Sequence, residues 1–380
     1  MEKWVPAFTT ADNAKKWRTL AMKKTTRALV VATVALAAAS YAQPPYSMTQ
    51  LWKIDAGGSA AWFANDNNTR GIGYNPSEGT LLAVSRTGGA AVYRLDPATG
   101  NAKSPDKLDL TGVSGGTLPV NLIAATSDGK LILTNLAASA NPFKIYTYAN
   151  ESATPTNSYN EPSVTVRYGD SLSVQGSGSN IRAIVTGQGL TPAPASAAIF
   201  TSTDGGQTFT KLDLTFSPAA VPGVFFVDWD PSATDAFFFR KCASTGTETP
   251  ALRRYTLSGS TATQDATFGD KLATLAGVGA FDVKQTANGN LLVANTYGAL
   301  SQGATNMPGT IYHIPSETLL AQTATGLEKA GGANLNGNGS GAAYMDLAGK
   351  RAFFLYTNNS ISAWQIPTEV ASGVADWNLY

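Results

Sequence analysis

The chain has 380 residues, of which 43% are hydrophobic and only 14% are charged, and its formal net charge at pH 7 is +1. This apolar content excludes a disordered chain, and so little charge is not typical of long surface helices. With 37 glycines, the composition favours many short strands joined by tight turns.

The N-terminal segment has the features of a secretory signal. Lys23, Lys24 and Arg27 precede an apolar stretch of about a dozen residues, and Ser40-Tyr41-Ala42 follows it. A basic start, an apolar centre and small residues at the end predict cleavage before Gln43. The alternative is an N-terminal membrane anchor, which is less favoured because the apolar stretch is short for a bilayer.

We therefore divide the chain into four parts. Residues 1–21 are interpreted as a non-native or untranslated extension, 22–42 as the signal peptide, 43–367 as a single domain and 368–380 as a C-terminal tail. The first 42 residues contain seven of the 27 basic and two of the 26 acidic residues, so the remainder carries a net charge of −4.

This charge and the signal together indicate compartment and partners. We expect an exported protein, periplasmic or extracellular, with no membrane span after signal cleavage. A mildly acidic surface without basic clusters does not favour nucleic acid as a partner. The partners that stay open are a glycan, a peptide or another envelope protein.

Six segments of the chain share one layout, in which an apolar strand, a tight polar turn and a second apolar strand follow one another. They begin at residues 71, 122, 172, 224, 280 and 342. Turn pairs such as Asp128-Gly129 and Asn288-Gly289 supply the positive φ angles that short hairpins need. A third strand such as Phe143–Tyr148 follows each hairpin, and a shorter fourth strand such as Phe209–Leu214 follows most of them. Four short antiparallel strands per repeat are typical of a propeller blade.

The sequence thus predicts an all-β propeller with six four-stranded blades. A ring of seven blades is the alternative, because the long stretches before Leu172 and Ala342 have room for further strands. The lone strand Thr49–Asp55 is expected to supply the outer strand of the last blade and so to close the ring without a bare sheet edge. A pair of β-sandwiches is the main competing architecture, but it does not predict such regular spacing.

One turn resembles a known structural motif. The segment Ser202-Thr-Asp-Gly-Gly-Gln-Thr-Phe209 is similar to the Asp-box of sialidases and related propellers. In this turn we expect Asp204 to accept hydrogen bonds from backbone amides, glycines such as Gly206 to allow the bend, and Phe209 to pack beneath. The resemblance implies a structural element away from the active face, formed by Ser202, Asp204, Gly206 and Phe209.

The chain from residue 50 to 366 also resembles a family of exported bacterial β-propeller proteins of unknown function. The residues that carry the resemblance are Arg70-Gly71, Tyr74-Asn75-Pro76, Leu81–Arg86, Asn141–Tyr146, Tyr148-Ala-Asn-Glu151 and Arg167-Tyr-Gly-Asp170. This resemblance implies no activity.

The sequence contains no clear catalytic set. Glutamates are scarce and none lies beside a tyrosine at an expected inner-strand end, which does not favour a sialidase. His313 is the only histidine, so sites with several histidine ligands are excluded, and we expect its side chain to point outward from a strand. The only cysteine, Cys242, follows three phenylalanines and is expected to be a buried, inert thiol.

No cofactor is predicted. A metal held at the channel mouth, as in lactonase-like propellers, has candidate ligands in Asn121, Asp170 and Asn295, but these form no local motif. Ca²⁺ binding by the loops Asn65–Asn68 and Asn334–Ser340 is a minor alternative, because neither loop has the full acidic ligand set.

Blade geometry selects one face as the candidate ligand site. The loop before the first strand and the loop after the second strand of each blade emerge on the same side, around the channel mouth. This face is expected to present polar side chains suited to a sugar, a peptide or a small anion. Its candidate ligand-binding residues are Arg70, Arg86, Asn121, Asn135, Asp170, Gln188, Arg240, Asn295, Tyr297 and Asn358. The simpler interpretation is that they are ordinary strand-end residues.

These features favour a non-enzymatic binding or scaffold protein of the cell envelope or exterior, with an unknown ligand. A hydrolase or lyase acting on polysaccharide or lactone is one alternative, and a purely structural surface protein is the other. Fold alone does not choose among them.

Overall fold

The computed structural model describes residues 45–187, 197–218, 225–241, 251–275, 278–297, 303–335 and 341–373. The predicted signal peptide, Gln188 and Cys242 lie outside these ranges. Within them the chain is all-β apart from the short helix α2 (Thr368–Ser372). No helix in the described ranges is long and apolar enough to cross a membrane.

Three sheets are simple four-stranded antiparallel meanders, in which each strand pairs with the next. The first contains β2 (Gly71–Asn75), β3 (Thr80–Ser85), β4 (Ala91–Leu95) and β5 (Ala102–Lys107). The second contains β6 (Leu118–Ala125), β7 (Leu131–Leu136), β8 (Phe143–Tyr148) and β9 (Thr156–Glu161). The third contains β10 (Ser171–Ser177), β11 (Asn180–Thr186), β12 (Ala197–Ser202) and β13 (Thr210–Asp213).

The fourth sheet has five strands in the order β14-β18-β17-β16-β15. Its strands are β14 (Thr215–Ser217), β15 (Phe225–Trp229), β16 (Ala236–Lys241), β17 (Leu252–Ser258) and β18 (Thr261–Gln264). The short β14 runs parallel to β18, whereas β15 to β18 form an antiparallel meander. The added strand was not predicted from the sequence.

The remaining strands form one eight-stranded sheet in the order β19-β20-β21-β22-β1-β25-β24-β23. They are β1 (Tyr46–Asp55), β19 (Val278–Gln285), β20 (Leu291–Tyr297), β21 (Thr310–His313), β22 (Thr318–Thr323), β23 (Gly341–Asp346), β24 (Arg351–Tyr356) and β25 (Ser360–Gln365). The sheet consists of two four-stranded units, β19–β22 and β23–β25 with β1, that meet where β22 lies beside β1. The pairing of β1 with β25 confirms that the leading strand completes the last repeat.

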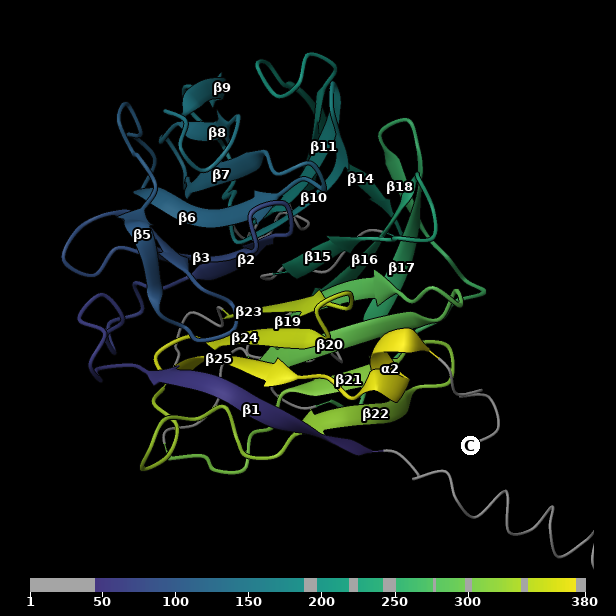
Figure 1. Ribbon diagram of the computed structural model, residues 1–380. Helices are drawn as coiled ribbons and strands as arrows, with labels where there is room; N and C mark the ends of the chain where they lie inside the picture. Colours follow the sequence, from purple (N-terminus) through teal and green to yellow (C-terminus); the bar gives the residue numbers. More distant parts are fainter. Residues whose placement is uncertain are drawn as a thin grey trace, which may run out of the picture. The chain divides into compact units, whose positions relative to one another are not determined.

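We call the strand that opens each repeat its first strand; the six are β2, β6, β10, β15, β19 and β23. Each contacts the first strand of the following repeat, and β23 contacts β2. The six therefore surround a common centre, as their labels do in Figure 1. Glycine is needed for one of these approaches, because a Cβ added at Gly73 would lie 2.5 Å from the Ile123 carbonyl oxygen.

The core is divided into clusters that lie between consecutive sheets. Aromatic rings dominate the cluster between the third and fourth sheets, where Phe225 and Phe239 stack with centroids 4.3 Å apart. The predicted turn glycines Gly129 and Gly289 both have positive φ, at 91° and 85°. Apolar strands and glycine turns thus build the sheets as the sequence predicts.

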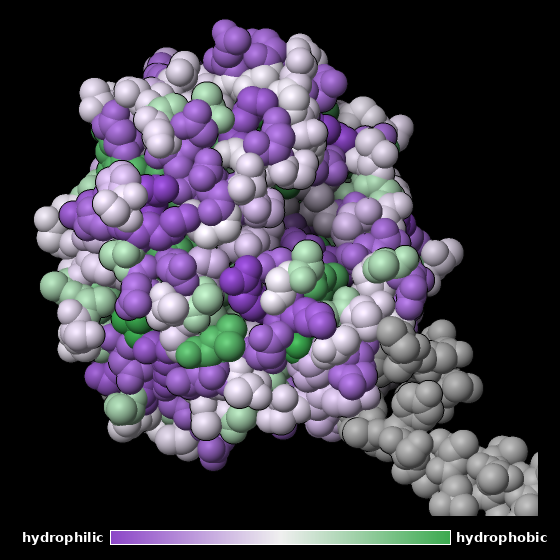
Figure 2. All heavy atoms as spheres, in the orientation of Figure 1, coloured by the Kyte–Doolittle hydropathy of each residue, from purple (hydrophilic) through white to green (hydrophobic). Residues whose placement is uncertain are grey.

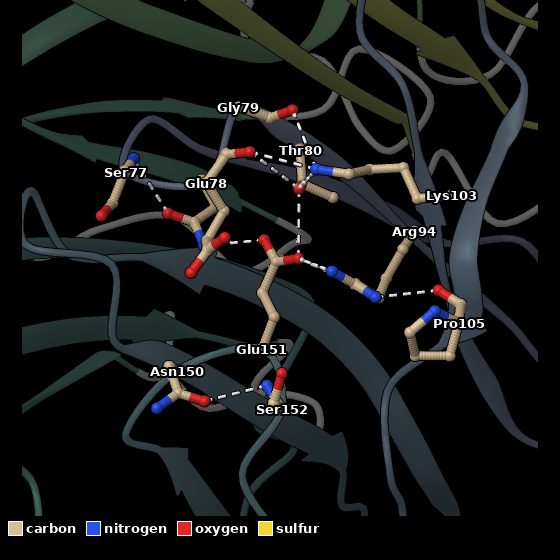
Figure 3. Close-up of polar contacts among 11 residues, drawn as sticks. Ser77, Glu78, Gly79, Thr80, Arg94, Lys103, Pro105, Asn150, Glu151 and Ser152 are labelled. Atoms are coloured by element: carbon tan, nitrogen blue, oxygen red, sulfur yellow. Dashed lines mark hydrogen bonds and ion pairs between the residues drawn. The ribbon is translucent and has the colours of Figure 1, made fainter.

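A buried ion pair joins the first two sheets (Figure 3). The Glu151 side chain, after β8, is only 1% exposed, and one of its carboxylate oxygens lies 2.7 Å from Arg94 Nη2 on β4. The same carboxylate accepts hydrogen bonds from Asn75 Nδ2 at 2.8 Å and Thr80 Oγ1 at 3.1 Å. Arg94 also donates to the Pro105 carbonyl oxygen at 2.9 Å. The pair is well satisfied and has a structural role.

The segment that follows β25 packs on the fifth repeat. Helix α2 buries Val370 and Ala371, and it ends at Gly373, which adopts a left-handed conformation. The Gly373 carbonyl oxygen accepts a hydrogen bond from Asn288 Nδ2 at 2.8 Å. The described start of the predicted C-terminal tail is therefore ordered against the sheet.

Candidate functional site

The six first strands enclose a cavity of about 120 Å³, which we call the central cavity. Each water molecule needs about 10–15 Å³ of cavity volume, so the cavity has room for roughly ten waters. Ten waters occupy about 300 Å³ in the liquid, which is at the lower end of the volumes of ligand pockets. In Figure 2 the surface is hollowed near its centre, among mostly hydrophilic and intermediate residues. The central cavity is therefore large enough for a small ligand.

Asp228 on β15 lines the central cavity and joins three first strands. One carboxylate oxygen accepts a hydrogen bond from the Val283 amide on β19 at 2.6 Å, and the other accepts from Ser173 Oγ on β10 at 2.5 Å. First strands have a free inner edge, whose amides need acceptors other than a neighbouring strand. The Asp228 carboxylate supplies such an acceptor.

Asp282 and Lys284, both on β19, form an ion pair in the cavity wall. The Asp282 carboxylate accepts from Lys284 Nζ at 2.6 Å and from the Met345 amide on β23 at 2.8 Å. Lys284 Nζ also lies 4.4 Å from the centre of the Tyr344 ring, so a cation–π contact adds to the ion pair. The lysine is thereby fixed in one orientation.

Burial and mutual repulsion shift the proton affinities of these groups. Burial raises the pKa of Asp282 to about 7; the charge of Lys284 opposes this and that of Asp228 adds to it. Burial also raises the pKa of Asp228, partly offset by Lys284 and by hydrogen bonds. Burial alone would lower the pKa of Lys284, but the neighbouring Asp282, Tyr344 and Asp228 outweigh it and raise that pKa well above its usual range. Lys284 is therefore a cation at every physiological pH.

Lys284 has donors left over for a ligand. An ammonium group has three N–H donors, and among the described residues only Asp282 accepts one of them. The Lys284 side chain is 29% exposed, and the residue lines the cavity. Its remaining N–H groups can bind an acceptor inside the central cavity.

Sequence reasoning missed Asp228, Asp282 and Lys284 as site residues, because it looked for function at loop ends rather than within the first strands. A signal was present. Carboxylates interrupt two otherwise apolar first strands, in Phe225-Phe-Val-Asp-Trp and Ala280-Phe-Asp-Val-Lys.

The structure brings several predicted residues together next to the cavity. We call Arg70, Arg86, Asn121, Arg167 and Asp170 the rim. Arg86 Nη1 donates to Asn121 Oδ1 at 2.8 Å, and Asn121 Nδ2 donates to the Gly169 carbonyl oxygen at 2.5 Å. Arg167, which was not predicted, forms a bidentate pair with Asp170 at 2.8 and 2.7 Å. Asp170 itself lines the cavity.

Arg70 differs from the other rim residues. It is only 5% exposed, and its guanidinium donates no hydrogen bond to any residue in the described ranges, with Nε wholly buried. Burial lowers the pKa of Arg70 to about 10, the negative charge of Asp170 opposes this shift, and the positive charge of Arg167 adds to it. Within the described part of the chain it is a buried cation without a bonded partner.

The other predicted face residues mostly serve the fold. Asn295 accepts from the fully buried Arg240 at 2.5 Å, and Asn358 pairs with Asn67 at 2.7 and 2.8 Å. Arg240 Nε and Nη2 have no hydrogen-bond partner among the residues that the structure describes. Asn135 holds its own loop by donating to the Pro142 carbonyl oxygen, and Tyr297 packs on Tyr356. These contacts tie neighbouring strands and loops, and Asn67, the partner of Asn358, also accepts a hydrogen bond from Arg86 of the rim.

The turn from Ser202 to Phe209 is closed by Asp204. Its Oδ1 accepts from the amides of Gln207 at 2.9 Å and Thr208 at 3.0 Å, and its Oδ2 accepts from Thr208 Oγ1 at 2.6 Å. The Gly206 amide donates to Ser202 Oγ at 2.8 Å, and Phe209 is buried. All of these bonds are internal to the turn.

The expectation for His313 was wrong. Its side chain is buried, with 2% exposure, and Nδ1 lies 2.7 Å from Ser316 Oγ. The histidine is therefore buried and satisfied locally, and it is not an outward polar residue.

The structure describes the first of the two Asn-rich loops and only the start of the second. Asp66 accepts from Asn68 and from Thr87 Oγ1, so its oxygens are used within the loop region. Of the second loop, residues 336–340 lie outside the described ranges. No group of three or more His, Cys, Asp or Glu side chains in those ranges is placed to hold a metal ion.

Residues 51–184 match the model of a family described as a domain of unknown function (DUF4623). This match covers less than half of the chain. A DUF4623 family protein from Bacteroides eggerthii has a similar structure, with a TM-score of 0.55 and 16% identity over 86% of this chain and 77% of that one. A protein of unknown function from Dyadobacter fermentans has a TM-score of 0.53 and 10% identity, over 85% and 100% of the two chains.

A more distant likeness is to the calcium-binding protein regucalcin from Agrobacterium tumefaciens, with a TM-score of 0.43 and 12% identity over 85% of this chain and 98% of that one. It does not bear on the fold or the ligand of this chain. No curated protein matches the sequence. At these identities the likeness to solved structures concerns the fold alone.

The DUF4623 match separates the two halves of the candidate site. The rim and the buried pair of Arg94 and Glu151 lie within the matched residues, whereas Asp228, Asp282 and Lys284 lie beyond them. The segments that carried the resemblance in the sequence are thus those that build the rim and join the first two sheets.

Proposed function

We propose that the chain is an exported, non-enzymatic binding protein, built as a six-bladed propeller, whose central cavity takes a small polar ligand. The blade count is supported by six strand units of which three are separate four-stranded meanders, by the closed circle of contacts among the first strands, and by the pairing of β1 with β25. The Ser202–Phe209 turn, with its Asp204-centred hydrogen bonds, is consistent with an Asp-box between the third and fourth strands of a blade.

The observation that carries the binding proposal is Lys284 in the wall of the central cavity. Its charge is held by Asp282 and by the Tyr344 ring, and it retains N–H donors without an acceptor among the described residues, in the wall of a cavity of about 120 Å³. A fixed cation inside a preformed polar pocket is suited to orient a ligand that carries hydroxyl or carbonyl acceptors. A glycan end or a short peptide offers such groups.

The engaged carboxylates argue for binding rather than catalysis. Both oxygens of Asp228 and both of Asp282 already accept hydrogen bonds from the protein. A hydrolase that cleaves glycosidic bonds needs two carboxyl groups free to face the substrate. The alternative of a hydrolase or lyase is favoured by one observation, the pKa of about 7 for Asp282, which suits a general acid or base.

Export rests on the sequence of residues 22–42. We expect the protein in the periplasm or outside the cell, with Gln43 as its first residue. Cell fractionation followed by mass spectrometry of the N-terminal peptide tests this. A protein that keeps residues 22–42 and stays with the membrane would contradict it.

The binding proposal is tested with a glycan array of neutral and acidic sugars. The wild-type protein is compared with Lys284→Met, which keeps the length of the stem but loses the charge, and with Lys107→Met, which removes a lysine from the exposed outer strand β5. We expect array signals that Lys284→Met weakens about tenfold or more and that Lys107→Met leaves unchanged. Equal binding by all three proteins, or no glycan bound by any, would overturn the cavity as a glycan site.

Activity assays on the same sugars and on lactones distinguish the alternatives. Release of reducing ends or ring opening of a lactone by the wild-type protein, lost in Asp282→Asn, would support the enzyme. A protein that binds no glycan and forms regular assemblies by itself would support the structural surface protein.

A further inference from the structure

The rim contains a buried positive charge to which no described side chain forms a hydrogen bond or an ion pair. Arg70 is 5% exposed, and in the described ranges its guanidinium has neither a hydrogen-bond acceptor nor an ion-pair partner. A guanidinium has five donors and keeps its charge in proteins, so burying it without acceptors is costly. Such a group calls for an acceptor, and beside a cavity a bound ligand can supply one.

The backbone around Arg70 fixes its position. The Arg70 amide donates to the Val84 carbonyl oxygen at 3.2 Å, and the next residue, Gly71, lies so close to β6 that an added Cβ would be 2.8 Å from Leu122 Cδ2. Gly71 and Asp170 both line the central cavity. The Arg70 backbone is therefore held at the edge of that cavity.

A second cation lies close by. The positive charge of Arg70 acts on Arg86, whose pKa falls to about 10, chiefly through burial, with Asp66 opposing. Arg86 donates only to neutral acceptors, the oxygens of Val120, Asn121 and Asn67, and its buried Nε has no partner. Arg86 thus adds positive charge to the rim without gaining a carboxylate contact.

The two nearby carboxylates do not remove this excess. Asp170 is bound bidentately by Arg167, and Asp66 accepts from Asn68 and Thr87. Among the described residues of this region, three guanidiniums and two carboxylates leave one positive charge in excess. Within that part of the chain Arg70 is the rim guanidinium without a bonded partner, so we assign the excess to it.

We propose that Arg70 and Arg86 form an anion site at the rim, which takes the carboxylate, sulfate or phosphate group of a small ligand whose remainder enters the central cavity. The fork of a guanidinium matches two oxygens of such a group, and low exposure strengthens each charge-assisted hydrogen bond. The inference rests on the proposed binding function only for the remainder of the ligand. The anion site itself is testable with simple ions.

The experiment measures thermal stability of the purified protein against sodium acetate, sodium sulfate and sodium phosphate, at ionic strength matched with sodium chloride. We expect a saturable rise in Tm with at least one oxyanion, because an ion that binds the folded state alone stabilises it. The three anions distinguish a carboxylate from a tetrahedral group. No saturable rise with any of them would overturn the proposal.

Variants then locate the effect. Arg70→Gln is expected to weaken the apparent affinity about tenfold or more, and Arg86→Gln to weaken it less. Arg182→Gln is the matched control, since Arg182 is already paired with Asp235 and lies on another strand end. An equal loss in the control would assign the effect to net charge and refute the site. If Arg70→Gln does not fold, Arg70→Lys keeps the charge without the fork and is expected to show the same weakening.

A failure of the anion-site proposal is distinguishable from a failure of the proposal that the central cavity binds a ligand. If the ions bind but the glycan array is silent, the anion site stands and the cavity proposal falls. If the array shows neutral sugars that depend on Lys284 while no oxyanion stabilises the protein, the reverse holds.

Discussion

Replacing Glu151 with alanine tests whether the contact in Figure 3 holds the first two sheets together. The Glu151 side chain is 1% exposed and that of Arg94 is 8%, so removal of the carboxylate leaves a buried guanidinium unpaired. Loss of one partner of a buried ion pair costs about 3–5 kcal/mol. With an m-value of about 3 kcal/mol/M, a loss of about 4 kcal/mol lowers the urea midpoint by roughly 1.3 M. Equilibrium unfolding in urea, followed by tryptophan fluorescence, measures this shift.

Two further variants separate charge from size and burial. Glu151→Gln keeps the shape and one acceptor, so we expect a smaller loss of about 2 kcal/mol. Asp235→Asn breaks the pair of Asp235 with Arg182, where the aspartate side chain is 63% exposed, and is expected to cost less than about 1 kcal/mol. The reasoning is refuted if Glu151→Ala is no less stable than Asp235→Asn.

Two other predictions concern the first strands. Gly73→Ala places a Cβ 2.5 Å from the Ile123 carbonyl oxygen, and we expect a loss of about 1–3 kcal/mol in the same urea assay; an unchanged midpoint would mean that β2 and β6 separate easily. Asp282→Asn tests the raised pKa. Because the folded protein holds a proton on Asp282 up to about pH 7 that the unfolded chain releases near pH 4, the wild type should lose stability relative to the variant as pH rises through this window, by at most about 4 kcal/mol. A constant difference between the two proteins from pH 4 to 8 would show that the pKa is not raised.

Much of the fold was predictable because its signals are local. Apolar strands such as Leu131–Leu136 alternate with turns that hold Gly129 or Gly289, and each pattern needs only a few neighbouring residues. The spacing of the repeats then places the first strands within a few residues of their observed starts. The parallel strand β14 was missed, because Thr215–Ser217 is too short to give a pattern and its partner β18 lies over 40 residues away.

The site was predictable only in part, because it depends on how separate repeats meet. Strand-end positions identified Arg70, Arg86 and Asp170, which do lie together. The same rule also selected Asn135 and Asn358, whose amides are used within loops. Which end residues are satisfied by their neighbours is decided by contacts across sheets, and no local pattern records them.

The charges in the cavity wall also depend on how separate repeats meet. A propeller-like arrangement leaves the inner edges of its first strands unpaired, and the chain meets this need with carboxylates placed on those strands. Lys284 then balances part of the buried negative charge. A charged cavity is therefore a consequence of closing the strands around a centre, and a ligand site arises where this balancing group still has donors to offer.

The charges of the two parts of the site have opposite sign. The rim with Asp66 carries one excess positive charge, whereas Asp228, Asp282 and Lys284 together carry one excess negative charge once both carboxyl groups are ionised. An anionic group is therefore favoured at the rim, whereas beside Lys284 the net negative charge disfavours an anion and the free N–H donors favour a neutral hydroxyl or carbonyl acceptor, so a ligand with both groups is bound in one orientation. Exchange of the ligand's anionic group for a hydroxyl should then abolish the effect of Arg70→Gln on affinity and leave that of Lys284→Met in place. If both effects disappeared together, the two parts would act as one site and the separation of charge along the cavity would have no role in orienting the ligand.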